Sequence, residues 1–225
     1  MPPKQQRGEA TVELLLTTAL RVYAEGGQQG FTVSAVTTAS KVSLGSLYHH
    51  FGSLDGLAVA LYIRCMERLF DEMIAALQRS RTARTGVRAL VRAYLRFTEE
   101  HRDAALFLHA SAYSGYLVAQ AEQIKAAKAA KLAVIGGWML PRMERGEILP
   151  VPGPLVEVLV MGPVAEAARR WLSDTYELDL AEAARILPES IWRSLRPEPS
   201  GATGMTGAAG AGGGDDCRPD HRPDH

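Results

Sequence analysis

Apolar residues recur at helical spacing through almost the whole stretch from residue 11 to residue 195, and no other feature of the sequence constrains the fold as much. The long segments are dominated by Ala, Leu, Glu and Arg, which are compatible with helices. They show little of the two-residue alternation that is typical of half-buried strands. The pattern therefore predicts an all-α protein.

Start and stop signals along the chain divide this pattern into separate helices. A first apolar stripe over residues 12–23 is expected to stop at the pair Gly26 and Gly27. Thr32 can cap a short second helix and Ser43 a third, over residues 44–51, before a long helix that begins near Leu54. Later helices are expected at residues 85–100, 103–112, 116–144, 155–173 and 179–195. Three prolines inside these patterns predict a kink or a break near each: Pro141, Pro163 and Pro188.

The composition is that of an ordinary folded protein. The 225 residues include 25 basic and 25 acidic side chains, so the formal net charge is zero, and 47% are hydrophobic. This balance excludes wholesale disorder and a polybasic nucleic-acid-binding tail. No uncharged apolar stretch reaches the roughly 18 residues of a membrane span, and no apolar segment follows the polar amino terminus. We therefore expect a cytoplasmic protein with no membrane contact.

The cysteines and the carboxy-terminal residues give little support for a metal or a cofactor, and we expect neither. Cys65 and Cys217 lie far apart and outside any CxxC spacing, which leaves a disulfide framework or a structural zinc site unsupported. Residues 197–225 are rich in Pro, Gly and Ala and are expected to form a disordered tail. Cys217, His221 and His225 can in principle ligate a metal, but a solvated tail is the favoured interpretation.

Residues 32–51, TVSAVTTASKVSLGSLYHHF, have the pattern of two short helices joined by a tight turn at residues 41–43. Val36, Val42, Leu47 and Phe51 can close a small core between these helices. The second helix then keeps a free face made of Leu44, Gly45, Ser46, Tyr48 and His49. Small residues can approach base edges closely, and hydroxyl and imidazole groups can reach phosphates. A glycine here costs the helix up to about 1 kcal/mol relative to alanine, and close approach to another surface would explain that cost.

At these residues the chain resembles the TetR family of bacterial transcriptional repressors. The resemblance covers residues 9 to about 69 and rests on the Val-Ser turn, the glycine that follows and the run Leu-Tyr-His-His-Phe. It implies a three-helix DNA-binding domain of the helix-turn-helix type at residues 9–69 and a helical bundle for effector binding and dimerisation at residues 70–196. It also implies contacts with DNA through Thr32, Lys41, Ser43, Leu44, Gly45, Ser46, Tyr48, His49 and Leu54.

Three departures from the family pattern imply fewer phosphate contacts than usual. Ser40 and Lys41 stand where the family usually has Ala-Gly, Leu44 replaces a frequent polar or basic residue, and Leu54 replaces a frequent phosphate-binding lysine. Four basic and four acidic side chains within residues 1–55 give this segment no net charge. Helix amino termini and hydroxyl donors can still bind phosphate, so we expect DNA binding with a weak salt dependence.

Candidate ligand-binding residues are aromatic, histidine and methionine side chains from residue 97 onward: Phe97, His101, Phe107, His109, Tyr113, Tyr116, Trp138, Met139, Met143 and Met161. The same residue types make up ordinary helical cores, and a core position is the favoured interpretation for most of them. No HExxH, GxSxG, phosphate-loop or strand-associated GxGxxG motif is present. We therefore do not expect an enzyme.

The sequence as a whole predicts a homodimeric transcription regulator, a repressor that a small-molecule effector releases from a double-stranded DNA operator. Apolar stripes on the last two helices predict a four-helix dimer interface: Leu155, Val158, Leu159, Gly162 and Ala165 with Leu180, Ala184, Leu187 and Ile191. Glu166 and Arg170 are expected to form a solvated i, i+4 ion pair. The alternative is a helical ligand-binding or adaptor protein that has lost DNA binding, which the neutral amino-terminal segment leaves open.

Overall fold

The computed structural model describes residues 3–111, 114–174 and 177–197, and these residues form helices and connecting turns without a strand. In chain order the helices are α1 (Pro3–Gly30), α2 (Val33–Ser40), α3 (Leu44–Phe51), α4 (Leu54–Gln78), α5 (Ala83–Glu100), α6 (Arg102–Ser111), α7 (Gly115–Ala119), α8 (Ala121–Glu144), α9 (Gly153–Leu172) and α10 (Leu180–Leu195). The all-α prediction is confirmed. Of these helices, none is both long enough and apolar enough to cross a bilayer. The expected tail, with Cys217, His221 and His225, lies outside the described residues from 198 onward.

Two expected helix ends differ from those in the structure. The first helix does not stop at the glycine pair but kinks at Gly27, where φ is 59° and ψ is −159°, and it continues to Gly30. Glycine can adopt this positive φ without steric strain, so the chain bends there without ending the helix. The single helix expected over residues 116–144 is divided at Gln120 into α7 and α8.

The three prolines do not end the helices that contain them. Pro141 lies inside α8, Pro163 inside α9 and Pro188 inside α10, and each helix continues beyond its proline. Of the expected kink or break, no break occurs at these positions. Proline removes one backbone hydrogen bond, but the packing of neighbouring helices can outweigh that loss, and Pro188 is itself buried.

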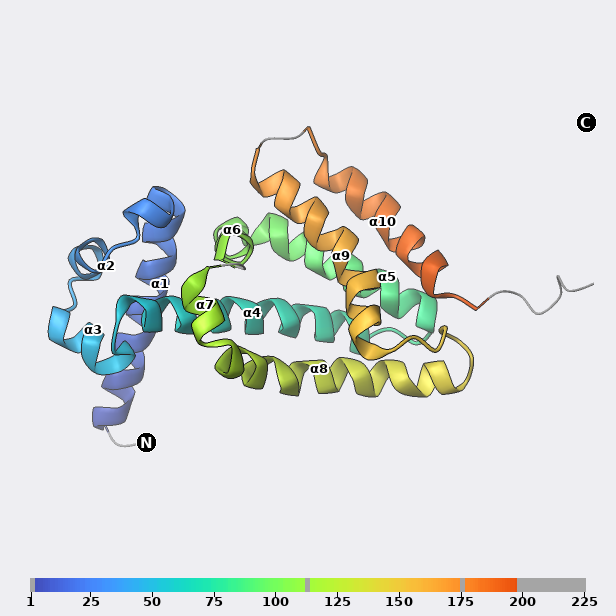
Figure 1. The fold of residues 1–225 in the computed structure, drawn as a ribbon, viewed down its shortest axis with the longest axis horizontal. Coiled ribbons are helices and arrows are strands. Elements are labelled where there is room, and N and C mark those ends of the chain that lie inside the picture. Colours follow the sequence, from blue (N-terminus) through green and yellow to red (C-terminus); the bar gives the residue numbers. More distant parts are fainter. Residues whose placement is uncertain (1–2, 112–113, 175–176, 198–225) are drawn as a thin grey trace, which may run out of the picture.

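Helices α1, α2 and α3 pack with the beginning of α4 at one end of the molecule (Figure 1). The centre of this region is formed by side chains that are fully buried: Leu15, Val36, Leu47 and Leu57. Tyr23 of α1 also meets Phe107 of α6 edge to face, with the ring centroids 4.8 Å apart. This aromatic contact joins the amino-terminal helices to the larger helical region.

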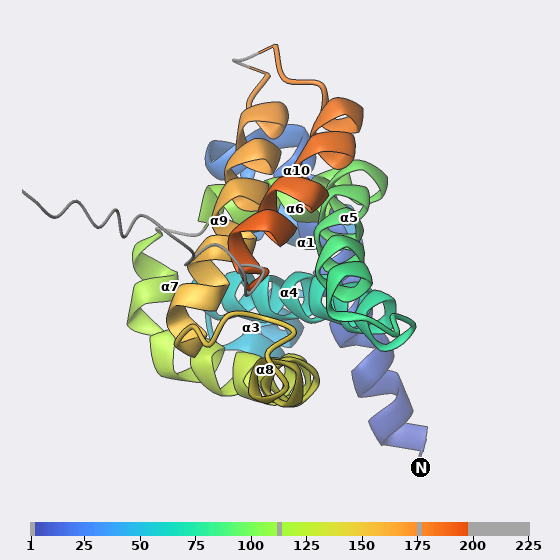
Figure 2. The same ribbon diagram turned by 90° about the vertical axis from the view of Figure 1, so that its right-hand side faces the viewer.

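Helix α4 belongs to both regions. Its beginning packs against α3, and the rest of it runs beside α8 and α5, while α9 and α10 pack on α5 (Figures 1 and 2). Because α4 is unbroken from Leu54 to Gln78, the domain boundary predicted near residue 69 falls inside a continuous helix. Because α4 packs in both regions, a shift of this helix would change the packing of both.

Candidate DNA-binding face and ligand cavity

Side-chain caps fix the turn between α2 and α3. Thr32 Oγ1 accepts a hydrogen bond from the backbone N–H of Ala35 at 3.1 Å, and Ser43 Oγ accepts one from the backbone N–H of Ser46 at 3.2 Å. Between the two helices Lys41 adopts the left-handed conformation, with φ at 57°, which ends α2. The predicted caps are confirmed, and they hold α3 at a fixed angle to α2.

One face of α3 is open to solvent. Leu47 is fully buried beneath the helix, whereas Leu44 is 53% exposed and Tyr48 is 45% exposed, and His49 is exposed beside them. A Cβ atom placed on Gly45 would have no neighbour within 4 Å. Between residues 32 and 53, Lys41 is the only Asp, Glu, Lys or Arg. The predicted face is therefore assembled as expected, exposed and almost uncharged.

Leu54 differs from the other predicted DNA-binding residues because it contributes to the core. It is the first residue of α4, half-buried and packed against the main hydrophobic cluster. Ser53 caps this helix by accepting a hydrogen bond from the N–H of Gly56 at 2.9 Å. A Cβ atom on Gly56 would collide with the carbonyl oxygen of Phe51, so the chain can turn this tightly from α3 into α4 only with glycine there.

A cavity of about 900 Å³ lies among α4, α5, α6, α8 and α9. Its walls are mostly apolar, and they include five of the seven methionines of the chain: Met66, Met73, Met139, Met143 and Met161. Methionine side chains are flexible and polarisable, so such walls can adapt to apolar molecules of different shape. A cavity of this size and lining can hold a small organic ligand.

Two neutral groups face each other in the cavity wall. The Tyr94 hydroxyl lies 3.1 Å from His109 Nε2, within hydrogen-bonding distance. Burial, assisted by the positive charge of Arg169, lowers the pKa of His109 from 6.5 to about 4. Burial also raises the pKa of Tyr94. Both side chains are therefore uncharged at neutral pH.

An ion-pair cluster stands on α9 at the edge of the cavity. Glu166 accepts hydrogen bonds from Arg169 at 2.7 Å and from Arg170 at 2.6 Å, so the predicted pairing of Glu166 with Arg170 is confirmed. These two guanidinium groups lower the pKa of Glu166 to about 2. Glu166 and Arg169 of this cluster line the cavity.

The structure brings only part of the predicted ligand-binding set to the cavity. His109, Met139, Met143 and Met161 line it. Tyr116 instead donates a hydrogen bond to the hydroxyl of Ser111. Phe97 and Phe107 are instead buried in the core, and His101 lies near Glu72 and Arg68. Trp138 packs on Gly86 beneath the guanidinium of Arg142, 3.6 Å from the ring centroid. Tyr113 lies outside the described residues.

Sequence reasoning missed most of the cavity wall, including Tyr62, Tyr94 and Lys128. The methionines gave the usable signal, because Met139 and Met143 lie one turn apart on the same helical face.

One group of potential metal ligands occurs within the described residues: Glu72, Glu100 and His101, whose ligand atoms lie within 4.8 Å of one another. Arg96 is 3.9 Å from the carboxylate of Glu72 and 3.7 Å from that of Glu100, and Arg68 also pairs with Glu72. These guanidinium groups already balance the negative charge that would attract a cation. The arrangement is that of an ion-pair network between α4 and α5.

The predicted dimer stripes have different surroundings on the two last helices. On α9, Leu155 is 54% exposed and Val158 is 63% exposed, so this face has no partner in the described residues. On α10, by contrast, Leu180 and Ile191 are buried within the chain, and Ile186 is the exposed apolar residue. The prediction that the α10 stripe faces a second copy is therefore wrong, because that stripe packs against the molecule's own α5 and α9.

Two short capped helices, a tight turn and a second helix with an open face define a helix-turn-helix domain. Residues 15–61 match the family model of the bacterial regulatory proteins of the tetR family, so this segment is similar to the amino-terminal domains of that family. Over 82 residues the chain is 33% identical to the HTH-type transcriptional regulator BetI of Rhizobium meliloti (strain 1021). That match covers 36% of this chain and 40% of the regulator, so it spans less than half of either protein.

Two solved structures share the arrangement of nearly all the helices. A TetR family transcription regulator from Marinobacter aquaeolei VT8 has a TM-score of 0.70 and 20% identity, covering 85% of this chain and 98% of that one. The transcriptional regulator FadR from Bacillus subtilis, solved in complex with stearoyl-CoA, has a TM-score of 0.69 and 17% identity, covering 80% of this chain and 96% of that one. At these identities the similarity establishes the fold.

Proposed function

We propose that this protein is a transcription regulator that binds an operator on double-stranded DNA through α3 and is released from it by a small molecule. In this proposal it acts in the cytoplasm as a homodimeric repressor. The observation that carries the proposal is the open face of α3, where Gly45 leaves room for a base edge between Leu44 and Tyr48. The named function of the relative BetI, transcriptional regulation, supports it.

The exposed apolar face of α9 supports the dimer. Leu155, Val158 and Leu159 form an apolar surface on one helix, and a second copy related by a two-fold axis could bury the same surface on both partners. A two-fold dimer would present two α3 helices and would therefore read a palindromic site.

Helix α4 supplies the connection between the cavity and the DNA-binding face. Tyr62 and Met66 line the cavity, while Leu57, less than two turns before Tyr62 on the same helix, is fully buried in the amino-terminal core. A ligand that displaces α4 would therefore change the position of α3. A coupling free energy of about 1 to 3 kcal/mol between the two sites is typical of such regulation. The stearoyl-CoA bound to the FadR structure supports a small-molecule effector in a protein of this fold.

Replacing Gly45 with leucine tests the DNA-binding face. Gly45→Leu would fill the open space of the α3 face and abolish specific binding to DNA from upstream of the protein's own gene, measured by fluorescence anisotropy. Gly137→Leu is the matched control, because Gly137 is an exposed helical glycine on α8 that also has no neighbour within 4 Å of an added Cβ. Both variants should melt at or slightly above the wild-type temperature, since leucine favours helices over glycine. Undiminished operator binding by Gly45→Leu would refute the assignment of α3.

The nearly uncharged surface of residues 32–53 favours one alternative, a ligand-binding or adaptor protein without DNA binding. In that case wild-type protein would bind upstream and unrelated duplexes equally weakly in the same titration.

A further inference from the structure

The polar and apolar side chains of the cavity are gathered at different ends. Helices α4 and α8 both run away from the amino-terminal domain, whereas α5 and α9 run back toward it (Figure 1). The polar residues lie early on α4 and α8 and late on α5, α6 and α9, at the end nearer that domain: Tyr62, Lys128, Tyr94, His109, Glu166 and Arg169. The opposite end is formed by Met73, Met139, Met143, Val151 and Pro154. The cavity is therefore amphipathic along its length.

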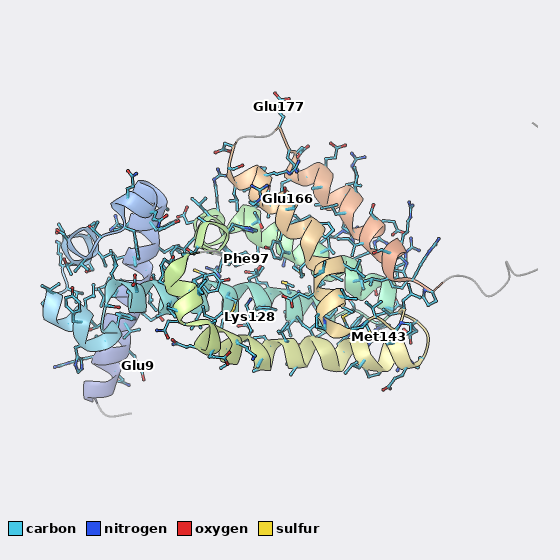
Figure 3. The ribbon with its side chains drawn as sticks, viewed as in Figure 1. Glu9, Phe97, Lys128, Met143, Glu166 and Glu177 are labelled. Atoms are coloured by element: carbon cyan, nitrogen blue, oxygen red, sulfur yellow. The ribbon has the colours of Figure 1, made fainter. Side chains whose placement is uncertain are left out.

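The cavity is also long. Lys128 and Met143 stand near opposite ends of its α8 wall (Figure 3). The fifteen residue steps between them correspond to about 22 Å along a helix. An elongated ligand can therefore use both ends, whereas a compact one would leave one end empty.

Lys128 is distinguished from the other two lysines on α8 by its surroundings. Lys125 pairs with Glu122 on the outer surface, and Lys131 pairs with Asp71 of α4. Lys128 lies between them, is half-buried at the cavity wall, and makes no ion pair with any described residue. A half-buried ammonium group that faces an apolar cavity is stabilised when an anion enters.

The remaining charges of the wall agree with an anionic ligand. The carboxylate of Glu166 is already shared by two guanidinium groups, so it does not neutralise Lys128. The other lining carboxylate, Glu157, is exposed to solvent on the first turns of α9, away from the polar end. The pKa of His109 is lowered mainly by burial, and the opposite charges of Arg169 and Glu166 act on it in opposite directions, so Lys128 is the charge that distinguishes this end of the cavity.

We propose that the cavity binds an elongated anionic amphiphile, a long-chain carboxylate, whose carboxylate meets Lys128 and whose hydrocarbon chain lies among the methionines of the opposite end. This inference rests on the proposed function because it identifies the effector of that regulator. The flexible methionines accept chains of differing length and branching, while Lys128 requires the negative charge.

The first test compares three probes of equal chain length below their micelle concentrations: tetradecanoate, tetradecanol and tetradecylammonium. Isothermal titration of the full-length protein should show tetradecanoate binding about tenfold more tightly than the alcohol, as expected for a charge-assisted contact, with the ammonium weakest. Equal binding of carboxylate and alcohol, or tighter binding of the ammonium, would overturn the assignment of the charged end. Absence of binding by all three would overturn the ligand class.

The second test asks whether Lys128 is the residue that binds the carboxylate of the ligand. Lys128→Gln should weaken tetradecanoate about tenfold and leave tetradecanol unchanged. Lys125→Gln is the control on the same helix, since it removes the same charge from the outer surface and should change neither affinity. Equal losses in the two variants would show a general effect of net charge and would overturn the role of Lys128.

Operator binding is measured separately so that the two proposals fail in different ways. Release of the operator by tetradecanoate supports both. Binding of tetradecanoate without release contradicts effector control while supporting the cavity's ligand class. Release by an unrelated neutral molecule, with no binding of tetradecanoate, overturns the ligand class and leaves the proposed regulator standing.

Discussion

The amino-terminal helices and the cavity-bearing helices are built by different kinds of interaction. Helices α2 and α3 have eight residues each, and each begins with its own side-chain cap and contributes one fully buried residue, Val36 or Leu47. The cavity, by contrast, is enclosed by side chains from five helices between residues 62 and 169. The first region depends on local geometry and presents a rigid face, whereas the second depends on contacts between distant segments and leaves space between them.

The largest effect is expected on the pH dependence of stability, because a neutral, half-buried histidine lies in the cavity wall. The folded-state pKa of His109 is about 4 against 6.5 in an unfolded chain. The unfolded state therefore binds protons more readily between these values, and the stabilising contribution, complete above pH 6.5, is lost as the pH falls toward 4. The loss is roughly 3 kcal/mol for a shift of this size. Urea unfolding at pH 7 and pH 4.5 should show wild-type protein losing more stability than His109→Gln. Parallel losses in the two proteins would contradict the assignment.

A smaller effect is expected where α5 meets α8. A Cβ atom on Gly86 would collide with the ring of Trp138, and the guanidinium of Arg142 lies over the same ring. Gly86→Ala should therefore lower the free energy of unfolding by about 2 kcal/mol through overpacking. Gly137→Ala, at an open position on α8, should instead be neutral or stabilising. Thermal unfolding of the pair measures the difference, and equal melting temperatures would show that Trp138 can move at little expense.

Loss of a helix cap in the amino-terminal region should lower the free energy of unfolding by a still smaller amount. Ser43→Ala removes the acceptor for the N–H of Ser46 and should lower stability by about 1 kcal/mol. Ser34→Ala, an exposed serine on α2 outside any cap, is the comparison. Chemical denaturation of both variants checks the prediction, and an unchanged midpoint for Ser43→Ala would place the determinant of the turn elsewhere.

The smallest effect is expected for Leu54→Lys, for which two outcomes compete. If residue 54 lies beside a phosphate, two lysines per dimer should steepen the slope of log affinity against log salt by about 1.8. The half-buried position of Leu54 against the core predicts that the same variant melts earlier. Salt titrations read beside melting curves separate these effects, and lowered stability with an unchanged slope would exclude the phosphate contact.

The sequence predicts the amino-terminal helices better than it predicts the cavity-bearing helices. Caps at Thr32 and Ser43 and the bounds of α3 are local properties, set by a few neighbouring residues, so the periodicity and capping rules locate them well. Leu54 shows the limit of prediction from local sequence. Its position beside the turn does not reveal whether its side chain lies on the buried or the exposed face of α4.

The cavity was harder to predict because a core side chain and a cavity-lining side chain have the same chemistry. Phe97 and Tyr94 lie one turn apart on α5, yet Phe97 is buried in the core and Tyr94 lines the cavity. The difference depends on the angle at which α9 packs on α5, and that angle results from many contacts between segments far apart in the chain. Periodicity identifies the inward face of each helix, but it does not identify where the inward faces of neighbouring helices stand apart and leave a cavity.

The scarcity of charge within residues 32–53 also has a consequence for how the protein would locate its site. With Lys41 alone between residues 32 and 53, few counterions are displaced when this surface meets a random duplex. Residence on unrelated DNA would then be brief, and the molecules would spend most of their time diffusing freely and little time sliding along the chromosome. Such a regulator loses the accelerated search of strongly basic repressors, but unrelated sequence sequesters fewer copies of it, so a small number of molecules can keep its operator occupied.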